Sequence, residues 1–398
     1  GVISNSDGLL IKLTPSGTVA WKKLYQTRGS DSVRDVTVDS VNGFIYALGS
    51  TNAPSTGATS ELGLLTSFSA QGSTSDIFVE KVESSNGAAS WTGSFGAYAQ
   101  DQANSIAFGN GKIYLAGAFG GSITGGKFAT TSTTTNSWIT SAQMPYTGVS
   151  ASANLVGYVL QINAADGVFG WSKTFGSTTS THKTSLRTVA YNTADDSVWV
   201  GGSFNGSTTW TNPGTTSTRT STNDAVTISN SIVVKLKSID GVSQSVWNAQ
   251  SCGTNQVNGI AITGAHEIVV TGNFQSISSN VDCIFEPITI PGSGKAIRTI
   301  GTTTFDGYVF KMSETLMATS PSPLWALGPS SINWIKTFGK VAAGSDTGNN
   351  VTFDASGMLY VTGNFGTLNL VLDDTLTVPD GQLTLRGVID GFVWKLSP

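Results

Sequence analysis

The chain has few charged residues, histidines and cysteines for its length of 398 residues. Charged side chains make up 12% of it, and 21 basic against 25 acidic residues leave a net charge of -4. Such a balance provides no basic field to collect phosphates, which argues against a nucleic-acid-binding module. An apolar content of 39% with so little net charge also argues against intrinsic disorder.

No apolar run approaches the roughly 18 residues of a membrane-spanning helix, so we expect no membrane span. The two cysteines, Cys252 and Cys283, flank a predicted strand pair, and they fit either a disulfide in an oxidising compartment or two free buried thiols. A zinc site is excluded, because there is no second cysteine pair and the histidines are only His182 and His266. We therefore expect neither a metal nor a cofactor.

What the sequence does contain is glycine, at 47 positions, and an internal repeat of about 75 residues built from four short segments. We name the segments by their residues: Asp-Gly segments, Trp segments, alternating segments and Gly-ended segments. The Asp-Gly segments are centred on Lys12, Lys81, Gln161, Lys235, Lys311 and Lys395, and the Trp segments on Trp21, Trp91, Trp171, Trp247 and Trp334. The alternating segments are 33–39, 103–108, 186–191, 257–262 and 349–354, and the Gly-ended segments end at Gly49, Gly117, Gly202, Gly272 and Gly363.

Each segment has 5 to 8 residues, is rich in β-branched and aromatic side chains, and is bounded by turn residues, which predicts a strand. Turns such as Asn42-Gly43 and Asn110-Gly111 join alternating and Gly-ended segments as hairpins. Four antiparallel strands per unit predict an all-β protein, a β-propeller of about five four-stranded blades, or six with one incomplete. We expect one domain over 1–398, with repeats at approximately 7–75, 76–155, 156–229, 230–305, 306–389 and a partial copy at 390–398.

The alternating segments predict how neighbouring blades pack. One face of each carries Val or Ile, at positions 36, 106, 189, 260 and 351. The next residue, on the opposite face, is small: Thr37, Ala107, Ala190, Ala261 and Thr352. We expect the bulky face of one blade to pack on the buried small face of the next.

The repeat also resembles a known family. The run Asp-Gly-Phe-Val-x-Lys-Leu, then Trp-x-Lys-Thr-Phe-Gly, then Leu-Tyr-Val-Thr-Gly-Asn-Phe is similar to the β-propeller repeats called SBBP repeats. The copies at 305–365 and 390–396 match best, and the copy at 230–274 departs around Trp247. The resemblance implies an extracellular microbial surface protein, and the Thr-rich run at 130–135 likewise favours a secreted protein.

A polar column recurs at the start of the alternating segments and is the candidate ligand-binding site. It consists of Arg34, Asn104, Arg187, Asn258 and Asn349. Three positions before each of them stand, in the same order, Asp31, Asp101, Thr184, Asn255 and Asp346. Such a ring could bind a sugar or an anionic group. The alternative is that these residues satisfy backbone groups at strand starts, and their repetition in every unit favours that structural role.

No residue pattern indicates catalysis. A repeated column of equivalent residues does not supply the unlike carboxylates of acid/base catalysis, and a Gly-x-Ser-x-Gly nucleophile motif is absent. The pairs Asp195-Asp196 and Asp373-Asp374 lack a calcium-binding loop. Of two glycosylation sequons, Asn205 is the candidate, whereas Asn350 lies within a predicted strand.

We therefore expect a non-enzymatic extracellular propeller, structural or adhesive, that binds copies of itself or other extracellular structural proteins in a surface layer, appendage or filament. The alternative is a carbohydrate-binding propeller, lectin-like or glycosidase-like, with glycans as partners. The ring would close by mixing C-terminal strands around Val351, Tyr360 and Phe392 with the N-terminal strand around Trp21. Closure leaves one Asp-Gly strand over, which either joins neighbouring units or belongs to an incomplete sixth blade.

Overall fold

The computed structural model describes residues 6–26, 29–52, 75–96, 101–120, 155–177, 179, 181–212, 215–220, 228–248, 253–263, 267–275, 305–313, 332–339, 344–366, 369–372, 382–384 and 389–396. All regular elements in these ranges are strands, so the fold is all-β as predicted. Antiparallel four-stranded sheets follow one another in the arrangement of a five-bladed β-propeller.

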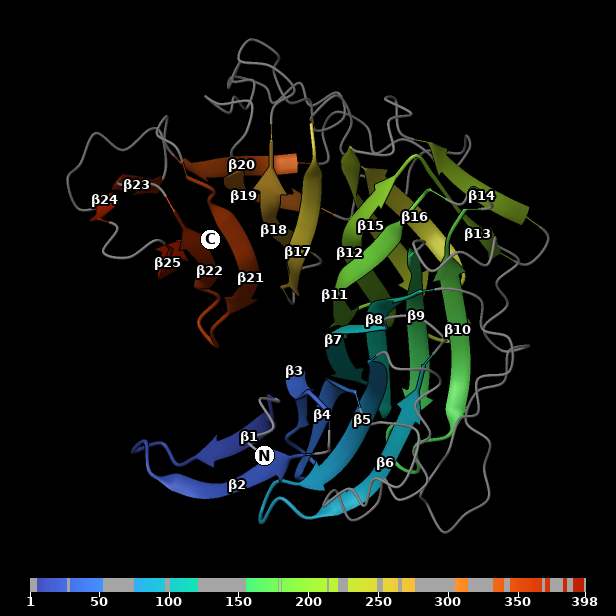
Figure 1. Ribbon diagram of the computed structural model, residues 1–398, viewed down its shortest axis with the longest axis vertical. Coiled ribbons are helices and arrows are strands. Elements are labelled where there is room, and N and C mark those ends of the chain that lie inside the picture. The colour runs from blue at the N-terminus through green and yellow to red at the C-terminus, as the bar shows by residue number, and fades with distance from the viewer. Residues whose placement is uncertain are drawn as a thin grey trace. The chain divides into compact units, whose positions relative to one another are not determined.

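The predicted segments become strands in one fixed order within a sheet: alternating, Gly-ended, Asp-Gly and Trp. The first sheet, drawn in blue to cyan in Figure 1, has β3 (Asp31–Asp39), β4 (Phe44–Thr51), β5 (Asp76–Glu83) and β6 (Ala89–Phe95). The second has β7 (Gln102–Gly109), β8 (Lys112–Gly120), β9 (Leu155–Asn163) and β10 (Phe169–Phe175). The third has β11 (Thr184–Asn192), β12 (Ser197–Asn205), β15 (Ser229–Lys237) and β16 (Ser243–Asn248).

The remaining sheets depart from four strands. The fourth has β17 (Asn255–Ile262), β18 (Glu267–Phe274), β19 (Asp306–Ser313) and β20 (Ile332–Gly339), extended by β23 (Asn369–Leu372) and β24 (Gln382–Thr384). The strands that the repeat assigns to a fifth blade are divided between two sheets. One has β21 (Thr347–Phe353), β22 (Leu359–Phe365) and β25 (Asp390–Leu396), and the other has β1 (Gly8–Leu13) and β2 (Val19–Tyr25). A separate hairpin pairs β13 (Ser207–Asn212) with β14 (Thr215–Thr220).

The strands that the predicted closure combines lie in the β21–β22–β25 sheet and in the β1–β2 sheet. In the latter, β2 pairs with β1, and closure of the ring by C-terminal strands and the Trp21 strand stays a prediction. The place beside β22 is filled by β25, which pairs with it along its whole length, from Leu359 opposite Leu396 to Phe365 opposite Asp390. Both β1 and β25 are Asp-Gly strands, and only one of them can occupy that edge.

The described residues form two compact units. One comprises 1–186 with 209–217, and the other 187–208 with 218–398. In the first unit, the second sheet buries Ile106 and Leu115 in one cluster with Tyr46 and Leu48 of the first sheet. In the second unit, Val351 and Phe392 pack with Val269 of the fourth sheet. Burial of these sheet faces is the main source of stability in each unit.

The packing of bulky on small side chains is confirmed where sheets meet. Ala190 packs against the cluster that contains Ile260 of the next sheet, and Ala261 packs against the cluster that contains Val351. The burial that we predicted for the small residues is wrong in degree, because Thr37, Ala107, Ala190 and Ala261 are half-buried and Thr352 is exposed. The face of β21 that carries Thr352 has no covering sheet within its described unit.

The Gly-ended strands show why the repeat requires glycine. In β8 and β18, a Cβ on Gly117 or Gly272 would overlap the carbonyl oxygen of Gln102 or Gln256 and the ring of a tyrosine. Tyr158 and Tyr308 cross the glycine to donate hydrogen bonds to those same carbonyl oxygens, at 3.2 and 2.9 Å. Because the glycine has no side chain, the tyrosine of an Asp-Gly strand has room to reach the alternating strand.

We predict that Gly272→Ala destabilises the protein by about 3 kcal/mol or more, because the methyl group must displace backbone and a buried ring. Gly391→Ala is the matched control, since a Cβ there meets nothing closer than 3.8 Å. Thermal unfolding followed by circular dichroism measures both. Equal melting temperatures for the two variants would contradict the crossing of ring and glycine.

Candidate functional site

The polar column lies at a β-bulge. The pairing of an alternating strand with its Gly-ended strand shifts register between Val33 and Asp35, and again between Ala103 and Ser105. The same shift occurs between Val257 and Gly259 and between Gly348 and Asn350. The extra residue at each shift is a column residue: Arg34, Asn104, Asn258 and Asn349. A bulge leaves one residue outside the ladder, so the column repeats because the bulge repeats.

Two of the five column side chains hold neighbouring sheets together. Asn104 Nδ2 donates to the carbonyl oxygen of Leu186 at 2.6 Å, and Asn258 Nδ2 donates to that of Gly348 at 2.8 Å. Both acceptors lie at the same position of the next alternating strand. The other three column residues, Arg34, Arg187 and Asn349, are exposed. Arg34 and Asn104 belong to one unit and Arg187, Asn258 and Asn349 to the other, and each group is described by itself.

The residues that precede the column are buried at strand starts. Asp31, Asp101, Thr184, Asn255 and Asp346 are all almost completely inaccessible. Asn255 accepts a hydrogen bond from the Ser231 N–H and donates one to the Gly253 carbonyl. Asp346 accepts one from the Gly366 N–H. These bonds favour the structural interpretation of this row over a ligand site.

A second row of contacts lies one residue beyond the column. Asp35 accepts hydrogen bonds from the Ile106 N–H and the Ser105 hydroxyl of the next alternating strand, both at 2.9 Å. Thr188 Oγ1 accepts the equivalent bond from the Ile260 N–H at 3.1 Å. Burial raises the pKa of Asp35, and the hydrogen bonds to its carboxylate oppose that rise.

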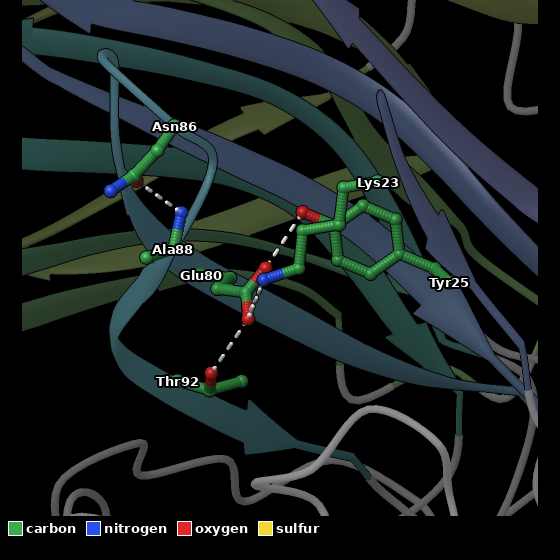
Figure 2. Close-up of polar contacts among 6 residues, drawn as sticks. All are labelled: Lys23, Tyr25, Glu80, Asn86, Ala88 and Thr92. Carbon is green, nitrogen blue, oxygen red and sulfur yellow. Dashed lines mark hydrogen bonds and ion pairs between the residues drawn. The ribbon is translucent and has the colours of Figure 1, made fainter. Parts of the chain in front are cut away.

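A buried charged cluster on the first sheet is the feature that sequence reasoning missed. Glu80, on β5, accepts hydrogen bonds from Tyr25 Oη at 2.7 Å, Lys23 Nζ at 2.9 Å and Thr92 Oγ1 at 3.2 Å. Figure 2 shows the three donors converging on its two oxygens. The Glu80 side chain is only 3% exposed, whereas Lys23 reaches the solvent. Burial raises the pKa of Tyr25 well above its ordinary value, and the nearby Glu80 charge raises it further, so the phenol remains a donor.

The cluster is a paired departure from the repeat. Where Glu80 stands, the other Asp-Gly strands carry Ile11, Leu160, Val234, Phe310 and Trp394. Where Tyr25 stands, other Trp strands carry Phe95, Phe175 and Phe338. A comparison of the copies for paired exceptions would have found both residues. Because the carboxylate is shielded and its partners bind it from three sides, the cluster attaches the β1–β2 hairpin to the first sheet.

The other candidate residues lie apart from any common site. His182 Nδ1 lies 2.9 Å from Ser177 Oγ. Asp195 pairs with Lys235, and Asp196 occupies a turn with a φ of 52°. Asn205 lies at the end of β12 and is 7% exposed, which disfavours a glycan there. Cys252, Cys283, His266 and Asp373-Asp374 lie outside the described residues, so the disulfide remains a prediction.

The described ranges contain no group of three or more His, Cys, Asp or Glu residues that could hold a metal ion. They also contain no apolar helix of membrane-spanning length.

Comparison with known proteins adds little. No protein-family model matches the chain, and no curated protein matches it. Among solved structures, it is similar to Trypanosoma rangeli sialidase in complex with sialic acid, at 9% identity and a TM-score of 0.28. It is also similar to the same sialidase in complex with the inhibitor DANA, at 10% identity and a TM-score of 0.27. These matches cover 92% of this chain but only 56% and 57% of the sialidase chain.

We predict that Tyr25→Phe costs about 1–3 kcal/mol, because a buried Glu80 oxygen loses its donor. Replacing the partner too, in Tyr25→Phe with Glu80→Leu, restores the apolar pair of the other sheets and should cost less than the sum of the single changes. Urea unfolding of the four proteins gives the coupling. Tyr360→Phe, which removes an exposed bond to Asp354, should change stability by less than about 0.5 kcal/mol. Additive single changes would contradict the cluster.

Asp35→Asn should stabilise the protein at neutral pH, because it removes a buried charge while its amide oxygen keeps the acceptor for Ile106 and Ser105. The Val36 N–H, which donates to the other carboxylate oxygen at 2.8 Å, belongs to an exposed residue and can bond water instead. The raised pKa of Asp35 means that the folded state binds its proton more tightly than the unfolded state does. The wild type therefore loses stability as the pH rises through the folded pKa, and the advantage of the variant vanishes below the ordinary aspartate pKa. Melting temperatures from about pH 3, which is below the ordinary aspartate pKa, to about pH 8 test this.

Asp35→Ala is the control for that experiment, since it also removes the acceptor and should be destabilising at every pH. An Asn variant that gains nothing at neutral pH would show that the carboxylate is better solvated than its contacts indicate.

Proposed function

We propose that this chain is a non-enzymatic, extracellular β-propeller scaffold, part of a cell-surface layer, an appendage or a filament, that acts by binding other proteins. The observation that carries the proposal is that the repeated polar side chains bind neighbouring strands. Asn104, Asn258, Asp35 and Thr188 form hydrogen bonds between successive strands of neighbouring sheets. A polar row engaged in joining sheets supports a scaffold rather than an active site.

The exposed surface supports protein partners. Leu9, Ile11, Leu13 and Leu24 form an apolar row on one face of the β1–β2 hairpin, each about half exposed. Contiguous exposed apolar side chains are typical of protein interaction sites. The resemblance to SBBP repeats and the Thr-rich composition support an extracellular setting.

The rival function, a carbohydrate-binding propeller, leads to a direct test. We expect the chain to bind no sugar on a glycan array and to release no sugar from a panel of glycosides. The exposed column residues are the relevant variants, because Arg34→Ala, Arg187→Ala and Asn349→Ala remove the side chains that a ligand could reach. Glycan binding or hydrolysis that these variants abolish would make the column a ligand site and overturn the scaffold.

Asn104→Ala is the matched change within the column. It deletes an amide that donates to the Leu186 carbonyl and should cost about 1 kcal/mol of stability.

A further inference from the structure

Two segments leave their sheets at the same point of the repeat. Both follow a Gly-ended strand and precede the Asp-Gly strand of the same sheet. The first runs from β12 to β15 and forms the β13–β14 hairpin, and the second runs from β22 to β25 and contains β23 and β24. Neither pair of strands joins the sheet from which its segment leaves.

Each segment instead reaches the outer strand of the preceding sheet, β10 or β20. Thr209 of β13 lies opposite Gly176, the residue after β10, in an antiparallel bridge. Val371 of β23 lies opposite Gly339, the last residue of β20. Both glycines follow the phenylalanine of a Trp segment. Two segments far apart in the chain thus add to equivalent points of their preceding sheets.

Backbone hydrogen bonds in both directions form the contact of β13 with the end of β10. The Gly176 N–H donates to the Thr209 carbonyl oxygen at 3.0 Å, and the Thr209 N–H donates to the Gly176 carbonyl oxygen at 2.6 Å. Beside this bridge, Lys173 Nζ donates to the Thr211 carbonyl oxygen at 2.7 Å. A charged donor therefore supports the bridge from the β10 side.

An indole anchors the same hairpin. Trp210 is 2% exposed, and its ring centroid lies 5.4 Å from that of the buried Phe175 at the end of β10. A two-stranded hairpin has too little surface to bury an indole by itself. The burial of Trp210 is therefore a property of the docked hairpin.

The division into compact units shows what this docking connects. Residues 209–217 belong to the first unit, although the chain on both sides of them, 187–208 and 218–398, belongs to the second. The contacts of 209–211 with 173–176 thus lie entirely within the first unit. The hairpin is covalently continuous with the second unit and packs as part of the first.

These contacts close sheet edges with very short ladders. The outer strand of a sheet presents unpaired N–H and carbonyl groups, which an added strand satisfies. One residue pair joins Thr209 to the end of β10, and two pairs join β23 to β20 among the described residues. Such short ladders open at a lower free energy than the sheets to which they are added.

We propose that the two segments are straps. Each fastens its own sheet to the preceding one by closing the outer edge of that sheet, and each is released without unfolding of either sheet. Release of the β13–β14 strap removes a link between the two units. Release of the β23–β24 strap acts within the second unit.

Hydrogen exchange at single amides of the full chain tests the release. The N–H groups of Gly176 and Thr209 bind each other's carbonyl oxygens, so one opening exposes both, and we expect equal protection factors for them. These factors should be lower than those of the β9 amides. The amides of β23 should likewise be less protected than those of β19, in the same sheet.

Lys173→Met deletes the ammonium group beside the bridge and keeps most of the apolar stem. It should lower the shared protection of Gly176 and Thr209 about tenfold, because a charge-assisted hydrogen bond is lost. The protection of the β9 amides should stay the same. Lys22→Met is the matched control, since it removes an exposed lysine of β2 and should change neither value.

Scanning calorimetry of the full chain tests the link between the units. We expect one unfolding transition for the wild type and two for Thr209→Pro, which removes an N–H of the bridge. Trp210→Ala, which removes the anchor, should divide the transition in the same way. Trp91→Ala is the matched control, because Trp91 is buried in the first unit on β6, in the first sheet. It should lower the melting temperature and keep a single transition.

The proposal is overturned if Gly176 and Thr209 differ in protection, or if they exchange only together with the β9 amides, because the segment would then open only with its sheet. It is also overturned if the wild type already shows two transitions or if Thr209→Pro keeps one. A division of the transition by Trp91→Ala would overturn it too, since any loss of stability in the first unit would then suffice.

Discussion

The structure depends on the packing of one β-sheet face on the next. Each sheet is a thin layer with two apolar faces, and a single layer cannot keep both from water. Successive sheets solve this by placing a Val or Ile of one alternating strand near a small residue of the preceding one, as Ile260 and Ala190 show. The glycine of each Gly-ended strand serves the same packing, since the rings of Tyr158 and Tyr308 cross it.

Polar side chains reinforce this packing where the strands bulge. A bulge frees one residue from the ladder, and Asn104 and Asn258 use that freedom to reach a carbonyl of the next alternating strand. Repetition of a polar residue in every copy is therefore a consequence of repeated geometry. The exposed members, Arg34, Arg187 and Asn349, are the ones left available to a ligand.

The β1–β2 hairpin is attached to its neighbouring sheet in a way that the other described strands are not. Besides apolar contacts, its attachment uses a buried carboxylate that accepts hydrogen bonds from Tyr25 and Lys23 of the hairpin and from Thr92 of its own sheet. Removing Tyr25 takes the donor from Glu80 Oε2, and removing Glu80 takes the acceptor from the buried Tyr25 hydroxyl, so the two residues are interdependent. A specific pair at this position fixes which sheet the hairpin joins, while its other face stays apolar and exposed.

The sequence by itself determined the local structure: the strands, their order in a sheet and the bulky and small positions follow from a period of two and from recurring turn residues. Only the tertiary structure decided which faces are covered. Leu9 and Phe78 occupy equivalent positions in equivalent strands, yet one is half exposed and the other buried, because burial depends on the neighbouring sheet. The choice of β25 over β1 beside β22 was equally open, since the two segments share their pattern. Glu80 could be placed only by its contacts, because its partners are 55 and 57 residues away in the chain.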